Sequence, residues 1–278
     1  MSEKKPRVSI IIPSLDGYRE GRLPKLLEEL SRQTYQDFEV QVIKGDPRQG
    51  RAINRGVKNS SGSILVIMDD DVSLGHNRVL ENLVKVIEED PRIGMAGASL
   101  SLPPEASWFH RRVIAELPRY TFPVVDKVVD SDFASHPCCA IPRRVFEEIG
   151  GEREEIIRGL DPDLRVRIRH AGYRVVLVPD TWIYHWPPRT FFGLLKKFFR
   201  NGMGSAYAQI VHPELVYETW EKLDMQKFVE KRPFFYRLLR FPLRLIHSIA
   251  TFKLFRFLSY LSYGLGFIWG WLKTKRKR

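Results

Sequence analysis

Residues 64–71 read ILVIMDDD, an apolar run of strand length that ends in three consecutive carboxylates. Three acids directly after a buried strand repel one another, so something positive has to offset them. A hard divalent cation such as Mg²⁺ or Mn²⁺ takes oxygen ligands and is often held by one or two carboxylates plus substrate phosphates. The alternative is a solvated loop that starts a helix, since Asp is also a good N-cap.

Around this run, apolar stretches of strand length alternate with stretches of helical period. This alternation is typical of an α/β fold whose mostly parallel sheet is covered on both faces. Ligands in such folds bind at the carboxyl ends of the strands, where the three acids lie. We expect strands at residues 8–12, 38–43, 64–68 and 173–178, and helices at about 23–30, 51–58, 80–87, 142–149 and 164–170.

Residues 103–135 interrupt this pattern, because they are rich in proline and aromatic side chains. A long irregular insertion is usually functional, so we expect a substrate-facing segment there, with plain cover of the domain as the alternative. The segment FFRNGMG at 198–204 carries two glycines between basic and aromatic residues and is expected to be a mobile loop. Its Arg200 would then be able to close over a bound diphosphate.

The charge is distributed unevenly along the 278 residues, whose formal net charge is +12. Residues 1–190 hold 28 Lys and Arg against 28 Asp and Glu, whereas residues 191–278 hold 17 against 5. We therefore expect a neutral globular domain over residues 1–205 and a basic helical region over 206–278. The adjacent Cys138 and Cys139 are poor disulfide partners, which favours a reducing compartment, and the N-terminal apolar run is too short for a signal peptide.

The last part of the chain is both basic and apolar. Its longest uncharged stretch, residues 257–272, has 16 residues, just under the roughly 17 to 25 of a membrane span. Basic residues flank it on both sides, and the positive-inside rule then disfavours a single crossing. We expect an interfacial helix or shallow hairpin that binds membrane lipids from about residue 234. A homo-oligomer interface or a helix covering the domain is the alternative, and the segment is too apolar for a nucleic-acid tail.

A second pair of acids lies in the segment RGLDPDL, residues 158–164. Asp161 precedes a proline, which favours an extended backbone, and Asp163 stands where a helix N-cap is wanted. We therefore expect Asp163 to be structural and Asp161 to be free to act as a general base. Taken alone, the segment favours a surface or capping role for Asp161.

Five segments in a fixed order carry a resemblance to a known family: VSIIIPS at 8–14, GRAINRGVKNSSGSILVIMDDDV at 50–72, CCAIPRRVFEEIGG at 138–151, GLDPDLRVRIRHAGYRVVLVP at 159–179, and Tyr184-His185. Together, over about residues 7–205, they resemble the family 2 glycosyltransferases of the GT-A fold. The resemblance implies a Rossmann-like, mostly parallel sheet flanked by helices. It also implies an inverting transfer of a sugar from a UDP- or GDP-sugar, with Mn²⁺ or Mg²⁺ as cofactor.

The same resemblance assigns roles to individual residues. Asp161 matches the acid that deprotonates the acceptor hydroxyl. Asp71 is the direct metal ligand, Asp69 lies nearer the ribose and phosphate and assists the metal, and His185 is a further metal or diphosphate contact. The nucleotide-sugar contacts are Pro13, Ser14, Asp16, Asp46, Arg51, Asn54, Asp69 and Asp70.

Three departures from the family pattern change what is expected. Leu160 replaces the usual Glu before the catalytic Asp, so the help that this Glu gives in acceptor binding is lost. The loop after the second strand is shortened to residues 44–47, which weakens the assignment of Asp46. The Gln-x-x-Arg-Trp motif of processive synthases is absent, so we expect transfer of a single sugar.

The expected acceptor is a lipid-linked saccharide or a polyprenyl phosphate, because the basic amphipathic tail favours a substrate at the membrane surface. This would place the protein at the cytoplasmic face of the membrane, in cell-envelope polysaccharide biosynthesis. One alternative is a nucleotidyltransferase, which would normally show a Gly-rich phosphate loop where this chain has Pro-Ser-Leu-Asp at 13–16. Another, suggested by Leu160, is a non-catalytic nucleotide-binding membrane scaffold of the same fold.

Overall fold

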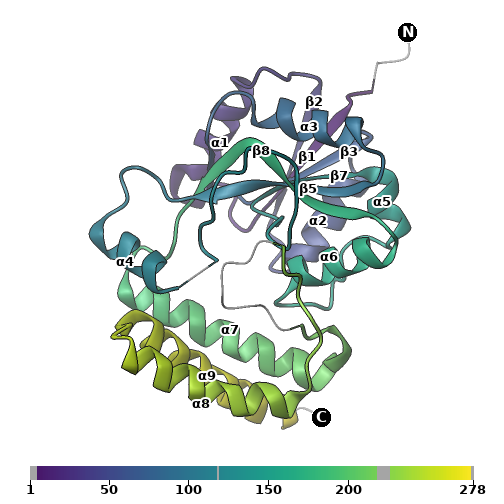
Figure 1. The fold of residues 1–278 in the computed structure, drawn as a ribbon. Helices are drawn as coiled ribbons and strands as arrows, with labels where there is room; N and C mark the ends of the chain where they lie inside the picture. The colour runs from purple at the N-terminus through teal and green to yellow at the C-terminus, as the bar shows by residue number, and fades with distance from the viewer. Residues whose placement is uncertain (1–4, 118, 218–225, 277–278) are drawn as a thin grey trace.

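A mixed β-sheet forms the centre of the molecule (Figure 1). The computed structural model describes residues 5–117, 119–217 and 226–276, and within these ranges the strand order is β2-β1-β3-β7-β5-β8-β4, with β6 paired to β8. The pairings show that β1, β2, β3, β5 and β8 run in one direction and that β4, β6 and β7 run against them. The predicted mostly parallel α/β sheet is therefore confirmed. The strands are β1 (Val8–Ser14), β2 (Phe38–Lys44), β3 (Ile64–Met68), β4 (Val72–Leu74), β5 (Ile93–Ser101), β6 (Val129–Asp130), β7 (Cys138–Pro142) and β8 (Arg174–His185).

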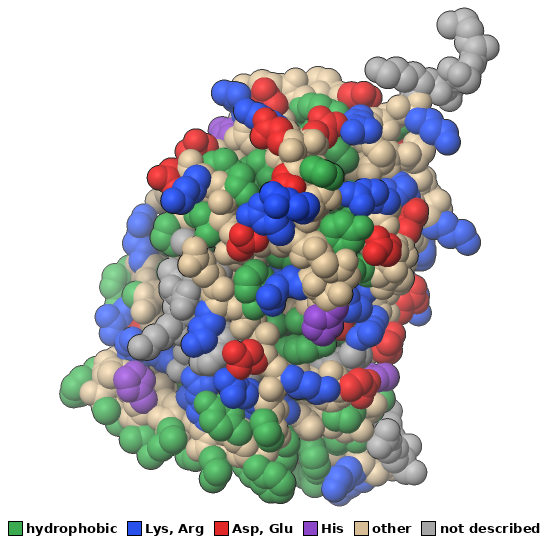
Figure 2. All heavy atoms as spheres, turned by 45° about the vertical axis from the view of Figure 1, so that its right-hand side comes forward, with side chains coloured by type: hydrophobic (Ala, Val, Ile, Leu, Met, Phe, Trp, Pro, Cys, Tyr) green, Lys and Arg blue, Asp and Glu red, His purple; other side chains and the backbone are tan. Residues whose placement is uncertain are grey.

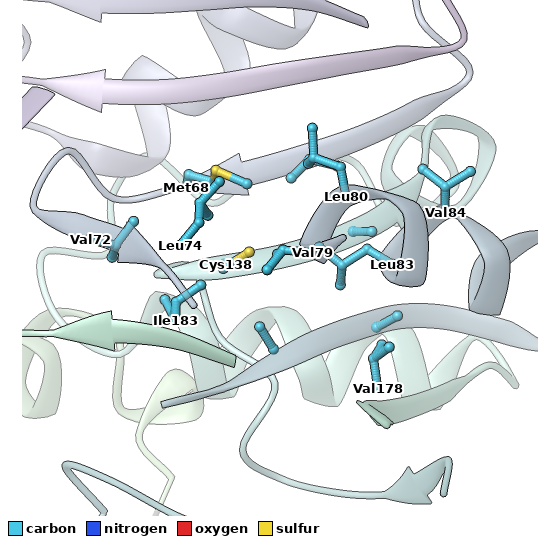
Figure 3. Packing of buried hydrophobic residues seen from close by; sticks show 14 of the residues in the cluster. Met68, Val72, Leu74, Val79, Leu80, Leu83, Val84, Cys138, Val178 and Ile183 are labelled. Atoms are coloured by element: carbon cyan, nitrogen blue, oxygen red, sulfur yellow. The ribbon is translucent and has the colours of Figure 1, made fainter. Parts of the chain in front are cut away.

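Helices cover both faces of this sheet, as the continuous apolar strands require. Along β3, Val66 and Met68 belong to the hydrophobic cluster beneath α1 and α3, whereas Leu65 and Ile67 belong to the cluster beneath α2, α5 and α6. Figure 3 shows the first cluster, in which Met68 and Leu80 are packed together with Cys138. The helices on the two faces are α1 (Arg22–Ser31), α2 (Gln49–Lys58), α3 (Val79–Glu89), α5 (Arg143–Glu148) and α6 (Leu160–His170).

The remaining helices lie apart from the two faces, at one end of the molecule (Figure 1). They are α4 (Trp108–Glu116), α7 (Phe191–Val211), α8 (Phe234–Ala250) and α9 (Leu254–Lys275). Two short 3₁₀ turns also occur, η1 (Arg19–Gly21) directly before α1 and η2 (Pro213–Leu215) after α7. Within the described ranges, no helix combines the length and hydropathy needed to cross a membrane.

The segment 198–204 is helical, so the prediction of a mobile loop there was wrong. Gly202 in this segment and Gly266 in α9 serve close packing between α7 and α9. A Cβ added at Gly202 would overlap the carbonyl oxygen of Tyr263, and one added at Gly266 would overlap that of Phe199. Backbones can approach this closely only where neither helix carries a side chain. The predicted domain boundary at residue 205 lies inside α7, and the division into two domains stays a prediction.

The insertion at 103–135 attaches the C-terminal helices to the sheet domain. Glu116 at the end of α4 is buried and accepts a hydrogen bond from the backbone N–H of Arg256, at 3.1 Å, in the first turn of α9. Its other oxygen pairs with Arg112 at 2.7 Å. A carboxylate at a helix N-terminus is stabilised by the exposed N–H groups there. The helix α4 of the insertion therefore packs on the start of α9.

The helix that carries the second pair of acids begins earlier than expected. It starts at Leu160 rather than 164, after Gly159 with φ of 94°, so Pro162 stands in its first turn, where a missing N–H costs nothing. Asp163 is therefore not the N-cap. It is buried and accepts hydrogen bonds from Arg153 at 2.9 Å and Arg167 at 2.8 Å. Its predicted structural role holds, but by ion pairing.

Candidate active site

The metal ligands predicted from the sequence lie together at the carboxyl edge of the sheet. Asp69 follows β3 directly, and β4 turns back to pair antiparallel with β8 so that Val72 lies opposite His185. This register brings Nε2 of His185 to 3.5 Å from Oδ1 of Asp71. Ligand atoms of Asp69, Asp71 and His185 all lie within 4.8 Å of one another.

The electrostatics of this group suit a cation. Burial raises the pKa of Asp69 to about 6, and the charge of Asp71 adds to this effect. Burial also raises the pKa of Asp71, but the hydrogen bond and charge of His185, together with Arg19, outweigh it and hold that pKa below its usual range. Two carboxylates and one imidazole form a donor set that Mn²⁺ accepts, while Mg²⁺ prefers oxygen alone. The residues present therefore fit a divalent metal, with Mn²⁺ the better match.

Asp70 lies outside this group and is bonded to the first strand. It accepts a hydrogen bond from Oγ of Ser14 at 2.6 Å and lies 3.3 Å from Nε of Arg19. Arg19 also donates to Asp71 at 2.8 Å, so one guanidinium bridges two of the three acids. Sequence reasoning missed Arg19. Its signal was the Asp-Gly pair after β1: Asp16 accepts the backbone N–H groups of Tyr18 and Arg19 in a tight turn.

The predicted nucleotide contacts after β2 bind one another. Arg51 donates to both oxygens of Asp46, at 2.7 and 2.9 Å, and this pairing lowers the pKa of Asp46 to about 2. Gln49, which was not predicted, donates to Asp69 at 2.9 Å. Pro13 lies in β1 beside β2, where Pro13 is opposite Ile43. The roles of these residues toward a nucleotide stay predictions.

Asp161 lies near the metal group, and its charge contributes to the raised pKa of Asp69. Oδ1 of Asp161 accepts the backbone N–H of His136 at 2.7 Å and lies 3.1 Å from Nδ1 of the same residue. Nε2 of His136 is 2.8 Å from Oε1 of Glu152. Two carboxylates therefore share one buried imidazole.

Asn54 places Glu152 in this arrangement. Its amide accepts the backbone N–H of Glu152 and donates to the carbonyl of the same residue, both at 2.9 Å. Asn54 was predicted to contact the nucleotide, but its polar atoms are turned toward the loop after α5. A role at the nucleotide itself is left as a prediction.

The charges of His136 and Asp161 follow from the attraction between the imidazole and the two carboxylates, which outweighs the effect of burial. Burial lowers the pKa of His136, but the charges of Asp161 and Glu152 outweigh it and raise that pKa well above the ordinary value. Burial raises the pKa of Asp161, but the charge and hydrogen bonds of His136 hold it below its usual range. His136 is thus an imidazolium at neutral pH and Asp161 a carboxylate, the form in which it can take a proton.

Two features of the trio were absent from the sequence prediction. His136 precedes β7, which runs antiparallel between β3 and β5, with Cys138 opposite Met68. The start of β7 therefore meets the end of β3, and periodicity gave no indication of that neighbour. Glu152 follows the Gly150-Gly151 turn, which was noted only as a helix end.

A further cation, Lys197 on α7, faces the site. Burial lowers its pKa, and the charges of Asp71 and Asp69 act in the opposite direction. Its Nζ lies 4.9 Å from the ring centre of Tyr120. A partly buried lysine within electrostatic reach of two acids is suited to contact an anion held between them. Its signal in the sequence was the pair Lys196-Lys197 inside an apolar helix.

The arrangement of acids at the strand ends of this sheet is that of a GT-A glycosyltransferase. Residues 26–204 match a family model described as Glycosyltransferase like family 2. Since the match spans more than half of the chain, the protein belongs to this family.

One curated relative and two solved structures are similar to this chain. Glycosyltransferase AglE from Haloferax volcanii is 28% identical over 238 residues, 73% of this chain and 74% of that protein. The mannosyltransferase PcManGT from Pyrobaculum calidifontis, solved in complex with GDP-Man and Mn²⁺, superposes with a TM-score of 0.54 at 16% identity, over 99% of this chain and 74% of that one. TarS from S. aureus superposes with a TM-score of 0.51 at 12% identity, over 74% of this chain and 40% of that one. The two structures share the fold with this chain.

Proposed function

We propose that this protein is a metal-dependent inverting glycosyltransferase that moves one sugar from a nucleoside diphosphate sugar to an acceptor hydroxyl at a membrane surface. One observation carries the proposal. Three residues that could bind a metal ion, Asp69, Asp71 and His185, lie at one edge of the sheet. The ionised Asp161 lies at the same edge and is held separately by His136. The fold match to a protein solved with GDP-Man and Mn²⁺ supports a nucleotide-sugar donor and a manganese cofactor.

One set of residues would act on the leaving diphosphate and another residue on the acceptor hydroxyl. Asp69, Asp71 and His185 would hold the divalent cation, which supplies positive charge where the diphosphate leaving group becomes negative. Lys197 adds a second positive charge on that side. Asp161 takes the proton of the acceptor hydroxyl. At the same time the acceptor oxygen bonds to the anomeric carbon, and the bond from that carbon to the diphosphate breaks. A single displacement of this kind inverts the anomeric configuration.

The proposed membrane location is supported by the outer faces of α8 and α9. Exposed apolar side chains recur at helical spacing on both helices: Phe235, Leu239, Leu243, Ile246 and Ile249 on α8, and Leu254, Leu261, Leu265, Ile268 and Leu272 on α9. Figure 2 shows hydrophobic side chains gathered at this end of the molecule. No Asp or Glu follows Glu230, whereas 12 Lys and Arg do. An apolar face with basic flanks suits an interfacial helix on anionic lipid.

The test of the donor and metal assignments is a thermal-shift screen of UDP- and GDP-sugars with and without Mn²⁺. A ligand that binds only the folded state stabilises it by about 2.7 kcal/mol at roughly 100 times its Kd. We expect one nucleotide sugar to raise Tm only in the presence of Mn²⁺. Asp71→Asn should abolish the Mn²⁺-dependent rise in Tm, while its neighbour variant Asp70→Asn should keep that rise. Equal shifts with and without Mn²⁺ in the wild type would refute metal dependence.

The test of the catalytic assignment uses the donor found in that screen. Asp161→Asn should abolish transfer, because the amide cannot accept the acceptor proton, while the Mn²⁺-dependent thermal shift persists. An inverted product, seen by NMR of the anomeric proton, is expected for the wild type. A retained anomeric configuration, or turnover by Asp161→Asn, would contradict the mechanism.

A further inference from the structure

A cavity of about 660 Å³ lies between the sheet domain and the C-terminal helices. Four parts of the chain line it: residues 47–49 after β2, residues 156–158 before α6, one side of α7, and the last turns of α9. It is distinct from the group of Asp69, Asp71 and His185, none of which lines it. The segment 156–158 leads directly to the helix that carries Asp161, so the cavity adjoins the acceptor side of the site.

The charged side chains that line the cavity are all cations. Arg48, Arg158, Arg200 and Lys273 contribute to its wall, and among the described residues no Asp or Glu does. In the part of the chain that the structure describes, no carboxylate forms an ion pair with Arg158, Arg200 or Lys273. Arg158 and Arg200 line the same cavity, and partial desolvation followed by the charge of Arg200 lowers the pKa of Arg158.

Contact with α7 fixes the position of the Arg158 side chain. Its aliphatic stem lies across α7 at Gly204, where an added Cβ would come within 2.5 Å of its Cγ. A larger residue at 204 would displace the arginine. Cations that line one cavity repel one another unless an anion neutralises them.

Phosphate groups are the anions that best satisfy such a pair. Guanidinium groups bind phosphate oxygens through two parallel hydrogen bonds, and two arginines with a lysine match a diphosphate. The volume lies within the roughly 300 to 1,000 Å³ of ligand sites. Apolar residues also line the cavity, among them Ile156, Met203 and Val211, so a chain of carbon atoms attached to the phosphate would be accommodated.

The cavity adjoins the metal group through Gln49, which lines it and donates to Asp69 at 2.9 Å, but its cations differ from those beside the acids. The donor's phosphates belong beside Asp69 and Asp71, where Arg19 and Lys197 already supply positive charge. Arg158 instead stands three residues before Asp161, and Lys273 comes from the end of α9. We propose that this cavity binds the phosphate or diphosphate of the acceptor and so presents the adjoining hydroxyl to Asp161. This inference rests on the proposed function.

The test measures binding to the full-length protein in metal-free buffer by calorimetry, with farnesyl diphosphate, inorganic pyrophosphate and farnesol as probes. We expect farnesyl diphosphate to bind. Its affinity should fall by about tenfold or more in Arg158→Gln and in Lys273→Gln, because each removes a charged hydrogen bond to phosphate. Lys275→Gln, a change of the same kind two residues away on α9 and outside the cavity wall, should bind as the wild type does.

The probes also distinguish the sources of the phosphate. Tighter binding of farnesyl diphosphate than of pyrophosphate would support a lipid-linked acceptor, and equal binding would support a water-soluble phosphorylated one. Farnesol binding as tightly as farnesyl diphosphate would overturn the inference, as would an equal loss in Lys275→Gln.

A second measurement separates this inference from the proposed function. The affinity for the nucleoside diphosphate with Mn²⁺ should be unchanged in Arg158→Gln and Lys273→Gln. A parallel loss of that affinity would assign the cavity to the donor and overturn the inference. Because farnesyl diphosphate binding requires no turnover, a protein that binds no nucleotide sugar would refute the proposed function while leaving the cavity's own test intact.

Discussion

At the scale of single residues, Asp161 is held by a partner that the family pattern does not predict. Where a Glu would normally precede it, Leu160 is buried and packs against Gly50. The chain instead links Glu152, nine residues before Asp161, to the Asp161 carboxylate through His136. The imidazole of His136 stands between the two carboxylates. Asp161 is fixed by a charge as well as by a backbone N–H.

His136 makes the stability of the protein depend on pH. Its pKa in the folded state is raised above that of the unfolded chain, so its stabilising effect is complete below the unfolded pKa. The effect is lost as the pH rises through the folded pKa. We expect the free energy of unfolding in urea to fall on the alkaline side of neutrality and His136→Gln to flatten this fall.

The control for this prediction is His170→Gln, which changes an exposed histidine at the end of α6. It should leave the pH profile of the unfolding free energy as in the wild type. Glu152→Gln should shift the alkaline fall to lower pH, because one of the two acids that raise the pKa of His136 is gone. Parallel profiles for the wild type and His136→Gln would show that the imidazole carries no stabilising charge.

At the scale of helices and strands, the sequence predicted what periodicity encodes and missed what depends on neighbours. Strands β1, β2 and β3 and helices α2 and α3 were expected close to where they lie, since their apolar spacing shows their faces. The acids after β3 pointed to a metal site, and the family resemblance added His185 to it. The antiparallel insertion of β7 was not predictable, because strand order leaves no period in a single chain. His136 and Glu152 were missed for the same reason.

The helix α7 shows why glycine misled the prediction. Gly202 and Gly204 suggest flexibility in isolation, yet each lies where another group comes close: the α9 backbone at Gly202 and the Arg158 side chain at Gly204. The α9 residues that contact Gly202 lie more than sixty residues further along the chain, beyond the reach of local sequence patterns. Glycine in a helix interior costs up to about 1 kcal/mol relative to Ala, so its presence here indicates a compensating contact.

This packing yields a prediction for Gly266. Gly266→Ala gains helix propensity but places a methyl group on the carbonyl of Phe199, which forces α7 and α9 apart. We expect a loss of about 1 to 3 kcal/mol in unfolding free energy. Lys196→Ala, on the exposed side of α7, is the matched control and should leave stability nearly unchanged. A stabilised Gly266→Ala would mean that the two helices are not in such close contact.

At the scale of the whole molecule, charge and apolar surface are segregated. The sheet domain is close to neutral, while α8 and α9 carry outward apolar faces and the basic excess. This asymmetry would orient the protein on an anionic membrane, with the C-terminal helices toward the lipid and the sheet domain away from it. The attachment of Glu116 to the start of α9 ties that orientation to the sheet domain.

The orientation predicts the effect of acids on the outward face. Leu239→Glu combined with Leu243→Glu, both on exposed positions of α8, should strongly reduce flotation with vesicles containing phosphatidylglycerol. Leu27→Glu, on the exposed side of α1 in the sheet domain, is the control and should float as the wild type does. Unchanged flotation of the double variant would assign the apolar faces to another partner.

The layer formed by α7 has a consequence for the height of the reaction centre. With α8 and α9 lying in the headgroup region, α7 stands between them and the acids, and each helix layer adds about 8 to 10 Å. The anomeric carbon would then be attacked well above the lipid phosphates. An acceptor whose reactive hydroxyl stays level with the headgroups would fall short. The cavity lined by α7, α9 and the segments 47–49 and 156–158 would then offer a route by which such a molecule is drawn partly out of the bilayer.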